Sequence, residues 1–119
     1  MRFIALALTA LVAALHVGFM VLEMFYWTEP FGLKTFNQTL EVAKQSAVLA
    51  ANQGLYNGFL AAGLVYALVT RKTDVRYLFL IFVMIAGVYG AWTAKPTILF
   101  VQALPAFLAA LATWRANSA

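Results

Sequence analysis

A histidine and a glutamate, His16 and Glu23, lie seven residues apart in a long apolar stretch near the N-terminus. In a helix this spacing places two side chains within about 20° of each other and roughly 10 Å apart along the axis. A carboxyl at membrane depth costs at least about 2.5 kcal/mol on insertion scales, so it normally faces the protein interior and has a partner. Glu23 could therefore hold a ligand or exchange a proton, with His16 as its deeper partner. The structural alternatives are a neutral carboxyl hydrogen-bonded to an amide and a satisfied structural histidine.

Amide and phenol groups in later segments could join this carboxyl. Asn52, Gln53, Tyr56 and Asn57 would cover an arc of about 140° on one side of a helix. Further along the chain, two more apolar segments carry Tyr89 and Gln102. If these segments cross a membrane, nearly all of the polar groups fall in its outer half, and the inner half is almost wholly apolar. We therefore expect an outward-opening polar pocket formed by His16, Glu23, Asn52, Gln53, Tyr56, Asn57, Tyr89 and Gln102, although Asn and Gln also serve simply as hydrogen bonds between membrane helices.

Small residues recur at four-residue spacing in two of the same segments. Gly54, Gly58 and Ala62 lie on the side opposite the amides, and Ala86 and Gly90 repeat the pattern further along. Such ladders let two helix backbones approach closely. We expect them to pack helices together, or to form the surface of a homodimer.

Other chemistries are disfavoured by residue type. The chain has one His and no Cys, so good metal ligands are too few, and we expect neither a metal nor a cofactor. The formal net charge is +4, but Lys and Arg stand singly or as one pair beside apolar stretches. That layout is typical of residues that flank membrane spans, and it disfavours a nucleic-acid partner.

The elements that must position these groups are membrane-spanning helices. Of the 119 residues 65% are hydrophobic and 10% are charged, with a mean hydropathy of +0.88. Soluble domains carry about 25% charged residues, and a helix needs roughly 20 apolar residues to cross a bilayer. Four segments meet that length, at about residues 3–27, 46–69, 75–94 and 97–114. They predict an all-α, antiparallel four-helix bundle in the lipid bilayer, forming a single transmembrane domain over residues 1–119.

The connection between the first two spans leaves two possibilities open. Apolar residues recur there at helical spacing. The second helix could begin outside the membrane near Thr39 and run inward without a break. Alternatively, a helix could lie on the membrane surface.

The distribution of Lys and Arg predicts the orientation. One side would hold five of them, Arg2, Arg71, Lys72, Arg76 and Arg115, and the other would hold three, Lys34, Lys44 and Lys95. Because the cytoplasmic side carries the excess, we expect both termini in the cytoplasm.

Several longer runs resemble a known family. They are Leu22-Glu23-Met24-Phe25, the run from Ala51 to Leu64 with its Asn-Gln-Gly-Leu-Tyr-Asn-Gly-Phe string, Val88-Tyr89-Gly90-Ala91, and the run from Ile98 to Ala106. Over nearly its whole length the chain resembles the small bacterial membrane proteins catalogued as domain of unknown function 1304. The resemblance implies a four-span protein of the bacterial inner membrane and brings no activity with it. The residues that match the family's motifs are those of the expected pocket.

Three functions follow as hypotheses. The leading one is a binding or transport site for a small molecule, reached from the outer side. Transport would need a second, inward-open state, which a chain this short usually reaches by dimerising. The second is a membrane enzyme acting on a lipid or isoprenoid, with Glu23 and His16 as acid and base. The third is an accessory subunit of a membrane complex whose polar residues only hold helices together.

Overall fold

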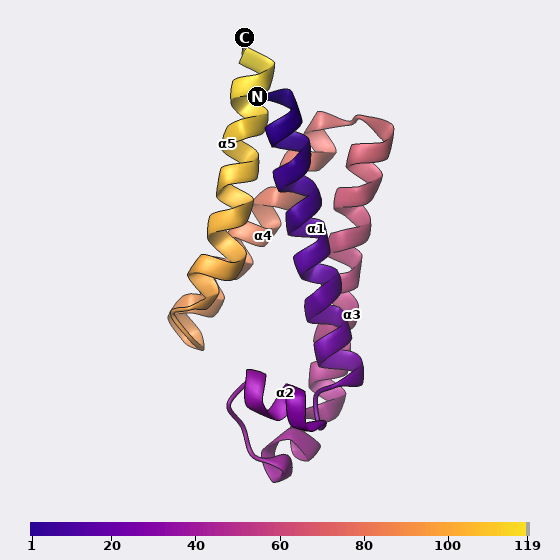
Figure 1. Cartoon of the computed structure of the whole chain (residues 1–119), viewed down its shortest axis with the longest axis vertical. Coiled ribbons are helices and arrows are strands. Elements are labelled where there is room, and N and C mark those ends of the chain that lie inside the picture. The colour runs from indigo at the N-terminus through magenta and orange to yellow at the C-terminus, as the bar shows by residue number, and fades with distance from the viewer. Residues whose placement is uncertain (119) are drawn as a thin grey trace. The chain divides into compact units, whose positions relative to one another are not determined.

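The structure, a computed structural model, describes residues 1–118, and nearly all of them are helical (Figure 1). The described residues contain no strand, so the expected all-helical class is confirmed. The elements are α1 (Arg2–Phe25), α2 (Pro30–Thr35), α3 (Leu40–Thr70), α4 (Thr73–Thr93), a π-helix η1 (Leu99–Ala103) and α5 (Leu104–Ser118).

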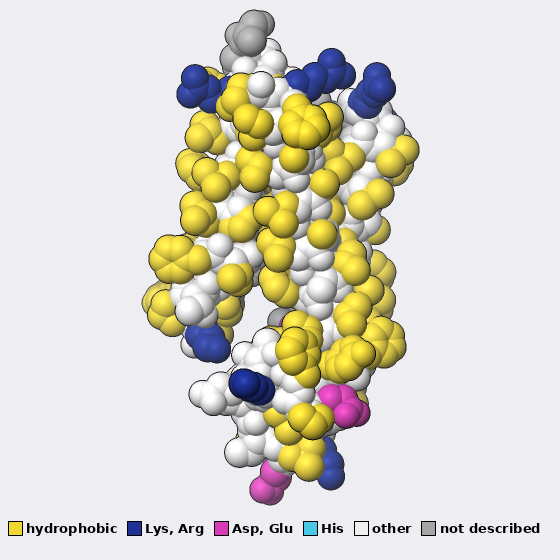
Figure 2. Space-filling view, viewed as in Figure 1, with side chains coloured by type: hydrophobic (Ala, Val, Ile, Leu, Met, Phe, Trp, Pro, Cys, Tyr) yellow, Lys and Arg dark blue, Asp and Glu magenta, His cyan; other side chains and the backbone are white. Residues whose placement is uncertain are grey.

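Three helical stretches are long and apolar enough to cross a membrane: Arg2–Phe25, Thr73–Thr93 and Leu99–Asn117. The longer α3 is not among them, because its amides and glycines dilute its apolar character. Large apolar side chains nevertheless lie over much of the face of the helices that Figure 2 shows. Phe3, Val48 and Trp92 are each more than 80% exposed in the isolated chain. A surface this apolar suits contact with lipid rather than with water.

The described chain divides into two compact units. The terminal unit consists of Met1–Ala14 together with the chain from Leu60 onward, and the middle unit is Leu15–Phe59. Both α1 and α3 therefore contribute one part to each unit.

The core of the terminal unit is formed by the start of α1, the end of α3, α4 and α5. Its buried apolar side chains are Val12, Ala13, Leu64, Leu80, Val83, Ala106 and Ala109. On α4 the buried residues Arg76, Leu80, Val83 and Gly87 form one stripe at helical spacing. Within this unit the N-terminus lies beside the C-terminal end of α5 (Figure 1).

A close backbone approach joins α4 to η1. A Cβ atom added at Gly87 would lie 2.5 Å from the backbone nitrogen of Ala103 and 2.8 Å from its Cα. Because real Cβ atoms do not come so near a backbone, only glycine fits at this position. The contact explains why Gly87 and Ala103 are both buried.

The fourth predicted span begins as a π-helix. The N–H of Leu104 donates to the carbonyl of Leu99, five residues earlier. Pro105, which follows directly, has no N–H to donate to the carbonyl of Val101. A local π-turn is one way in which a helix re-satisfies the backbone groups that a proline leaves without a partner.

The turn between α3 and α4 ends one helix and starts the next within two residues, Arg71 and Lys72. Arg71 adopts a left-handed conformation with φ of 58°. The N–H of Lys72 then donates to the carbonyl of Ala67 at 3.1 Å, which is a common way to end a helix. The short turn makes α3 and α4 antiparallel neighbours.

In the middle unit, the segment between α1 and α3 folds back against the start of α3. The indole N–H of Trp27 donates to the hydroxyl of Ser46 at 3.1 Å, and its ring packs on Phe36 with centroids 4.8 Å apart. Gly32 lies against the backbone carbonyl of Tyr26, where a side chain would not fit. These contacts hold α2 between the end of α1 and the start of α3.

The connection contains a short separate helix followed by the start of the long second helix. The helix α3 begins at Leu40 and runs unbroken to Thr70. The hydroxyl of Thr39 accepts a hydrogen bond from the N–H of Val42 at 3.2 Å and so caps its start. The six-residue α2 is a separate helix that precedes it.

Candidate functional site

The carboxylate of Glu23, near the end of α1, accepts two hydrogen bonds from α3. The side-chain amide of Gln53 donates to Oε2 at 3.0 Å, and that of Asn57 donates to Oε1 at 2.5 Å. Glu23 is buried, with 6% of its surface exposed. Gln53 and Asn57 are four residues apart, so they lie on the same face of α3.

No cation neutralises this carboxylate within the described part of the chain. Glu23 has the two amides as its hydrogen-bond partners and forms no ion pair there. The two lysines of the middle unit, Lys34 and Lys44, are both exposed. Side-chain amides orient a carboxylate and satisfy part of its hydrogen-bonding capacity, but they bring no positive charge.

Two glycines bring α3 close enough to α1 for these hydrogen bonds to form. A Cβ added at Gly54 would lie 3.0 Å from the Cβ of Glu23 and 3.2 Å from the backbone oxygen of Met20. One added at Gly58 would lie 2.7 Å from Sδ of Met20. The small-residue side and the amide side of α3 therefore adjoin and both face α1, which corrects the opposite arrangement expected from the sequence. A homodimer would accordingly need a surface other than Gly54 and Gly58.

The remaining ladder residues are placed less favourably for close packing. Ala62 and Ala86 are exposed, whereas their neighbours Ala61 and Gly87 are buried. Gly90 is half-buried, and a Cβ there would lie 3.2 Å from Cγ2 of Ile98. A helix face returns after seven residues more closely than after eight, so a strict four-residue spacing drifts off the contact face.

His16 is fully buried and its ring stands edge-on to Phe19, with centroids 5.1 Å apart. It makes no hydrogen bond to Glu23, whose described partners are the two amides. The two side chains share a helix but do not form a directly bonded acid–base pair.

Asn52 and Tyr56 lie on the exposed surface of the middle unit. The Tyr56 ring packs edge-on against Phe59, with centroids 5.7 Å apart. Of the predicted site residues in this unit, the structure thus brings Glu23, Gln53 and Asn57 into contact. Asn52 and Tyr56 do not join that contact.

The last two predicted site residues belong to the terminal unit. Tyr89 is 63% exposed on α4, and its backbone carbonyl accepts a hydrogen bond from the hydroxyl of Thr93 at 2.7 Å. Gln102 is half-buried on η1.

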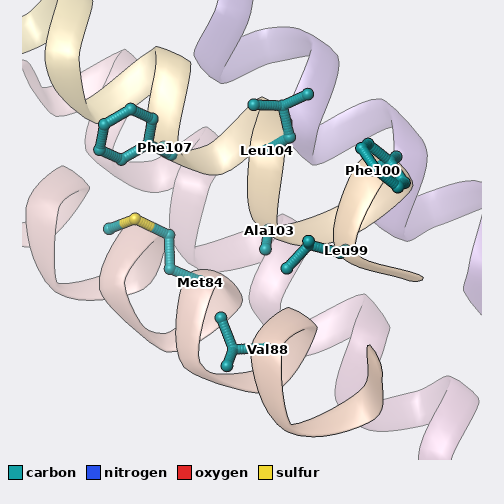
Figure 3. A pocket seen from close by; sticks show the side chains of 7 residues that line it. All are labelled: Met84, Val88, Leu99, Phe100, Ala103, Leu104 and Phe107. Atoms are coloured by element: carbon teal, nitrogen blue, oxygen red, sulfur yellow. The ribbon is translucent and has the colours of Figure 1, made fainter. Parts of the chain in front are cut away.

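An apolar cavity of about 320 Å³ lies in the terminal unit between α4, η1 and α5 (Figure 3). Its lining consists of Met84, Val88, Leu99, Phe100, Ala103, Leu104 and Phe107. None of the predicted site residues lines it. Sequence reasoning missed this cavity, and the only signal for it was Pro105, which marks the irregular helix beside it.

The described residues offer no cluster of three or more His, Cys, Asp or Glu that could hold a metal ion. Glu23 is the only acidic side chain at the site, and the other two contacts are amides. The group is suited to hydrogen bonding and to charge pairing.

A family model described as a protein of unknown function (DUF1304) matches residues 10–114. The chain belongs to this family. The resemblance noted in the sequence is thereby confirmed, and the match spans both the Glu23 contact and the cavity. An uncharacterized protein, YpaA of Lactococcus lactis subsp. lactis (strain IL1403), is 30% identical over 118 residues, which cover 96% of this chain and 99% of that protein. No solved structure matches. The DUF1304 description names no activity.

Proposed function

We propose that the middle unit binds a small molecule with a positively charged, hydrogen-bond-donating head, and that Glu23 is its charged contact. The observation that carries the proposal is a buried carboxylate oriented by two amides with no cation beside it in the described chain. A buried charge is normally paired. A ligand, or a proton, supplies the missing partner.

The donors and acceptors at this contact favour the same class of ligand. Gln53 and Asn57 direct their N–H groups to Glu23, and their amide oxygens have no hydrogen-bond partner among residues 1–118. The contact therefore combines a carboxylate with two open acceptors. Ammonium and guanidinium groups carry several donors and no acceptor, so they complement it.

The proposed setting is the bacterial inner membrane, with four spans and both termini in the cytoplasm. Three stretches are apolar enough to cross, and α3 would be the fourth span. Lys and Arg gather at the end of the terminal unit where the chain termini lie (Figure 2). This supports a cytoplasmic location for that end. Glu23 lies near the opposite end of α1, so the ligand would be reached from the outer side.

Transport is an extension of this proposal. It requires a second state with a different affinity for the ligand. A homodimer could provide one through a surface other than the glycines that face α1. The enzymatic alternative has less support, because Glu23 and His16 are not hydrogen-bonded to each other.

A matched series of probes tests the proposed charge preference. Purified protein would be titrated with benzylamine, benzyl alcohol and benzoate, which share a ring and differ in charge. We expect benzylamine to bind more tightly than the other two in the wild type, and this preference to vanish in Glu23→Gln. The control is Glu41→Gln, which removes the same charge from an exposed position. Equal binding of benzylamine and benzyl alcohol by the wild type would contradict the proposal.

A further inference from the structure

Besides Glu23 in the middle unit, the structure buries a second charged side chain, that of Arg76 in the terminal unit. Arg76 is the fourth residue of α4 and is only 8% exposed. It extends the buried stripe of Leu80, Val83 and Gly87 toward the N-terminal end of α4. Arginine is almost never buried to this extent unless its charge is paired.

The hydrogen bonds of Arg76 are few and weak. Its Nη1 donates to the hydroxyl of Thr113 on α5 at 3.5 Å, the outer limit for such a bond. That hydroxyl donates in turn to the carbonyl of Ala109 at 2.7 Å. Nε of Arg76 is buried and has no partner. A guanidinium has five N–H donors and does not lose its proton in proteins, so most of its capacity is unused.

The surrounding charges make this position more positive still. Arg2 is close enough to act electrostatically on Arg76. The one acidic residue of the terminal unit's sequence, Asp74, is exposed and forms no ion pair within the described chain. Lys and Arg side chains are the charged groups that Figure 2 shows at this end. The described chain therefore supplies no anion for the buried guanidinium.

The start of α4 adds to the attraction for an anion. Lys72 precedes the helix and provides no side-chain cap for its first N–H groups. The uncapped start of a helix carries a partial positive charge and N–H groups suited to phosphate. Asp74, in the first turn, offsets part of this charge but is exposed, whereas Arg76 is buried. The buried guanidinium and the first N–H groups of α4 therefore lie at the same end of the helix, and Arg76 is the stronger attraction for an anion.

We propose that Arg76 and the start of α4 bind a phosphate group, supplied by an anionic phospholipid of the leaflet on the side of the chain termini. Phosphate matches the planar guanidinium in geometry as well as in charge. Basic pockets between membrane helices on the cytoplasmic side are known to take anionic headgroups. Because the group lies in the terminal unit, this proposal is independent of ligand binding at Glu23.

Native mass spectrometry of the detergent-solubilised full chain, titrated with phosphatidylglycerol or phosphatidylcholine, tests the proposal. We expect the wild type to prefer phosphatidylglycerol. In Arg76→Gln the dissociation constant of the first phosphatidylglycerol should rise about tenfold or more, as for loss of a charged hydrogen bond. The control, Arg71→Gln, removes the same charge from an exposed turn. High salt screens the diffuse attraction between exposed charges and the lipid. Under that condition Arg71→Gln should change the dissociation constant of phosphatidylglycerol by less than about twofold.

Two further arms make the result decisive. Arg76→Lys keeps the charge but not the planar guanidinium. It should bind phosphatidylglycerol several-fold more weakly than the wild type while retaining the wild-type helix content, and it replaces Arg76→Gln as the test if that variant fails to fold.

Inorganic phosphate should not displace phosphatidylglycerol from the wild type. Displacement at equal concentrations would support an anion site at Arg76 but assign it to soluble phosphate. The proposal is overturned if the wild type shows no preference for phosphatidylglycerol, if Arg71→Gln weakens it as much as Arg76→Gln, or if Arg76→Lys binds like the wild type.

Discussion

The side-chain amide of Asn57 on α3 donates a 2.5 Å hydrogen bond to the carboxylate of Glu23 on α1, 34 residues earlier in the chain. Gln53 donates to the other carboxylate oxygen, one helical turn away. Together they fix the register of the two helices in the middle unit, because a shift by one residue would break both bonds. Glu23 is thus both a structural contact of the middle unit and its proposed ligand contact.

The first prediction concerns the structural part of this contact. Asn57→Ala should lower the free energy of unfolding by about 1 kcal/mol, since hydrogen bonds between membrane helices average somewhat less than this and those to charged groups are stronger. The measurement is reversible unfolding in mixed micelles. Asn52→Ala is the matched control, because Asn52 is exposed and lies outside the contact. Equal losses in the two variants would show that the Asn57 bond contributes nothing specific.

The second prediction concerns the backbone contact between Gly87 and Ala103. Gly87→Ala should destabilise the protein by about 1–3 kcal/mol, because the new methyl group would overlap a backbone that cannot move aside. In Gly18→Ala the methyl group meets nothing within 4 Å. That variant should be unchanged or more stable by up to about 1 kcal/mol, because alanine is the better helix former. Thermal unfolding followed by circular dichroism compares the two, and the same effect in both would refute the contact.

The third prediction concerns the hydrogen bond from Trp27 to Ser46 in the middle unit. Trp27→Phe and Ser46→Ala each remove the hydrogen bond between the turn after α1 and the helix α3, at a cost of about 1 kcal/mol. The double variant should cost less than the sum of the single ones, because the bond can be lost only once. Unfolding free energies of the four proteins in the cycle give the coupling. Strictly additive losses would mean that the two side chains do not interact.

Much of the helical arrangement could be predicted from the sequence. The long apolar runs and the short turn at Arg71 and Lys72 set the main helices, and the polar residues in those runs indicated that Glu23 would find an amide. The sequence did not reveal which amide. A helix face is only about 100° wide, so small differences in rotation decide that Gln53 and Asn57 reach Glu23 while Asn52 points away.

Other features depend on contacts that no local pattern records. Gly87 is buried because Ala103, sixteen residues later, lies against it, whereas the four-residue spacing had favoured Ala86. The π-helix at Leu99–Ala103 depends on how Pro105 is accommodated by its neighbours. Arg76 counted in the sequence only as a charge that sets orientation, because its burial follows from the packing of α4 on α5.

The most direct test of the central claim is native mass spectrometry on protein released gently from its own membranes, comparing the wild type with Glu23→Gln and Glu41→Gln. Ligand binding at Glu23 predicts a bound small molecule on the wild type and on Glu41→Gln. That molecule should be absent from Glu23→Gln, although the variant keeps the helix content of the wild type. Its mass would identify the class of ligand and the spectrum would show the oligomeric state. Bare, equally stable protein in all three forms would contradict the claim and favour an accessory role for the chain.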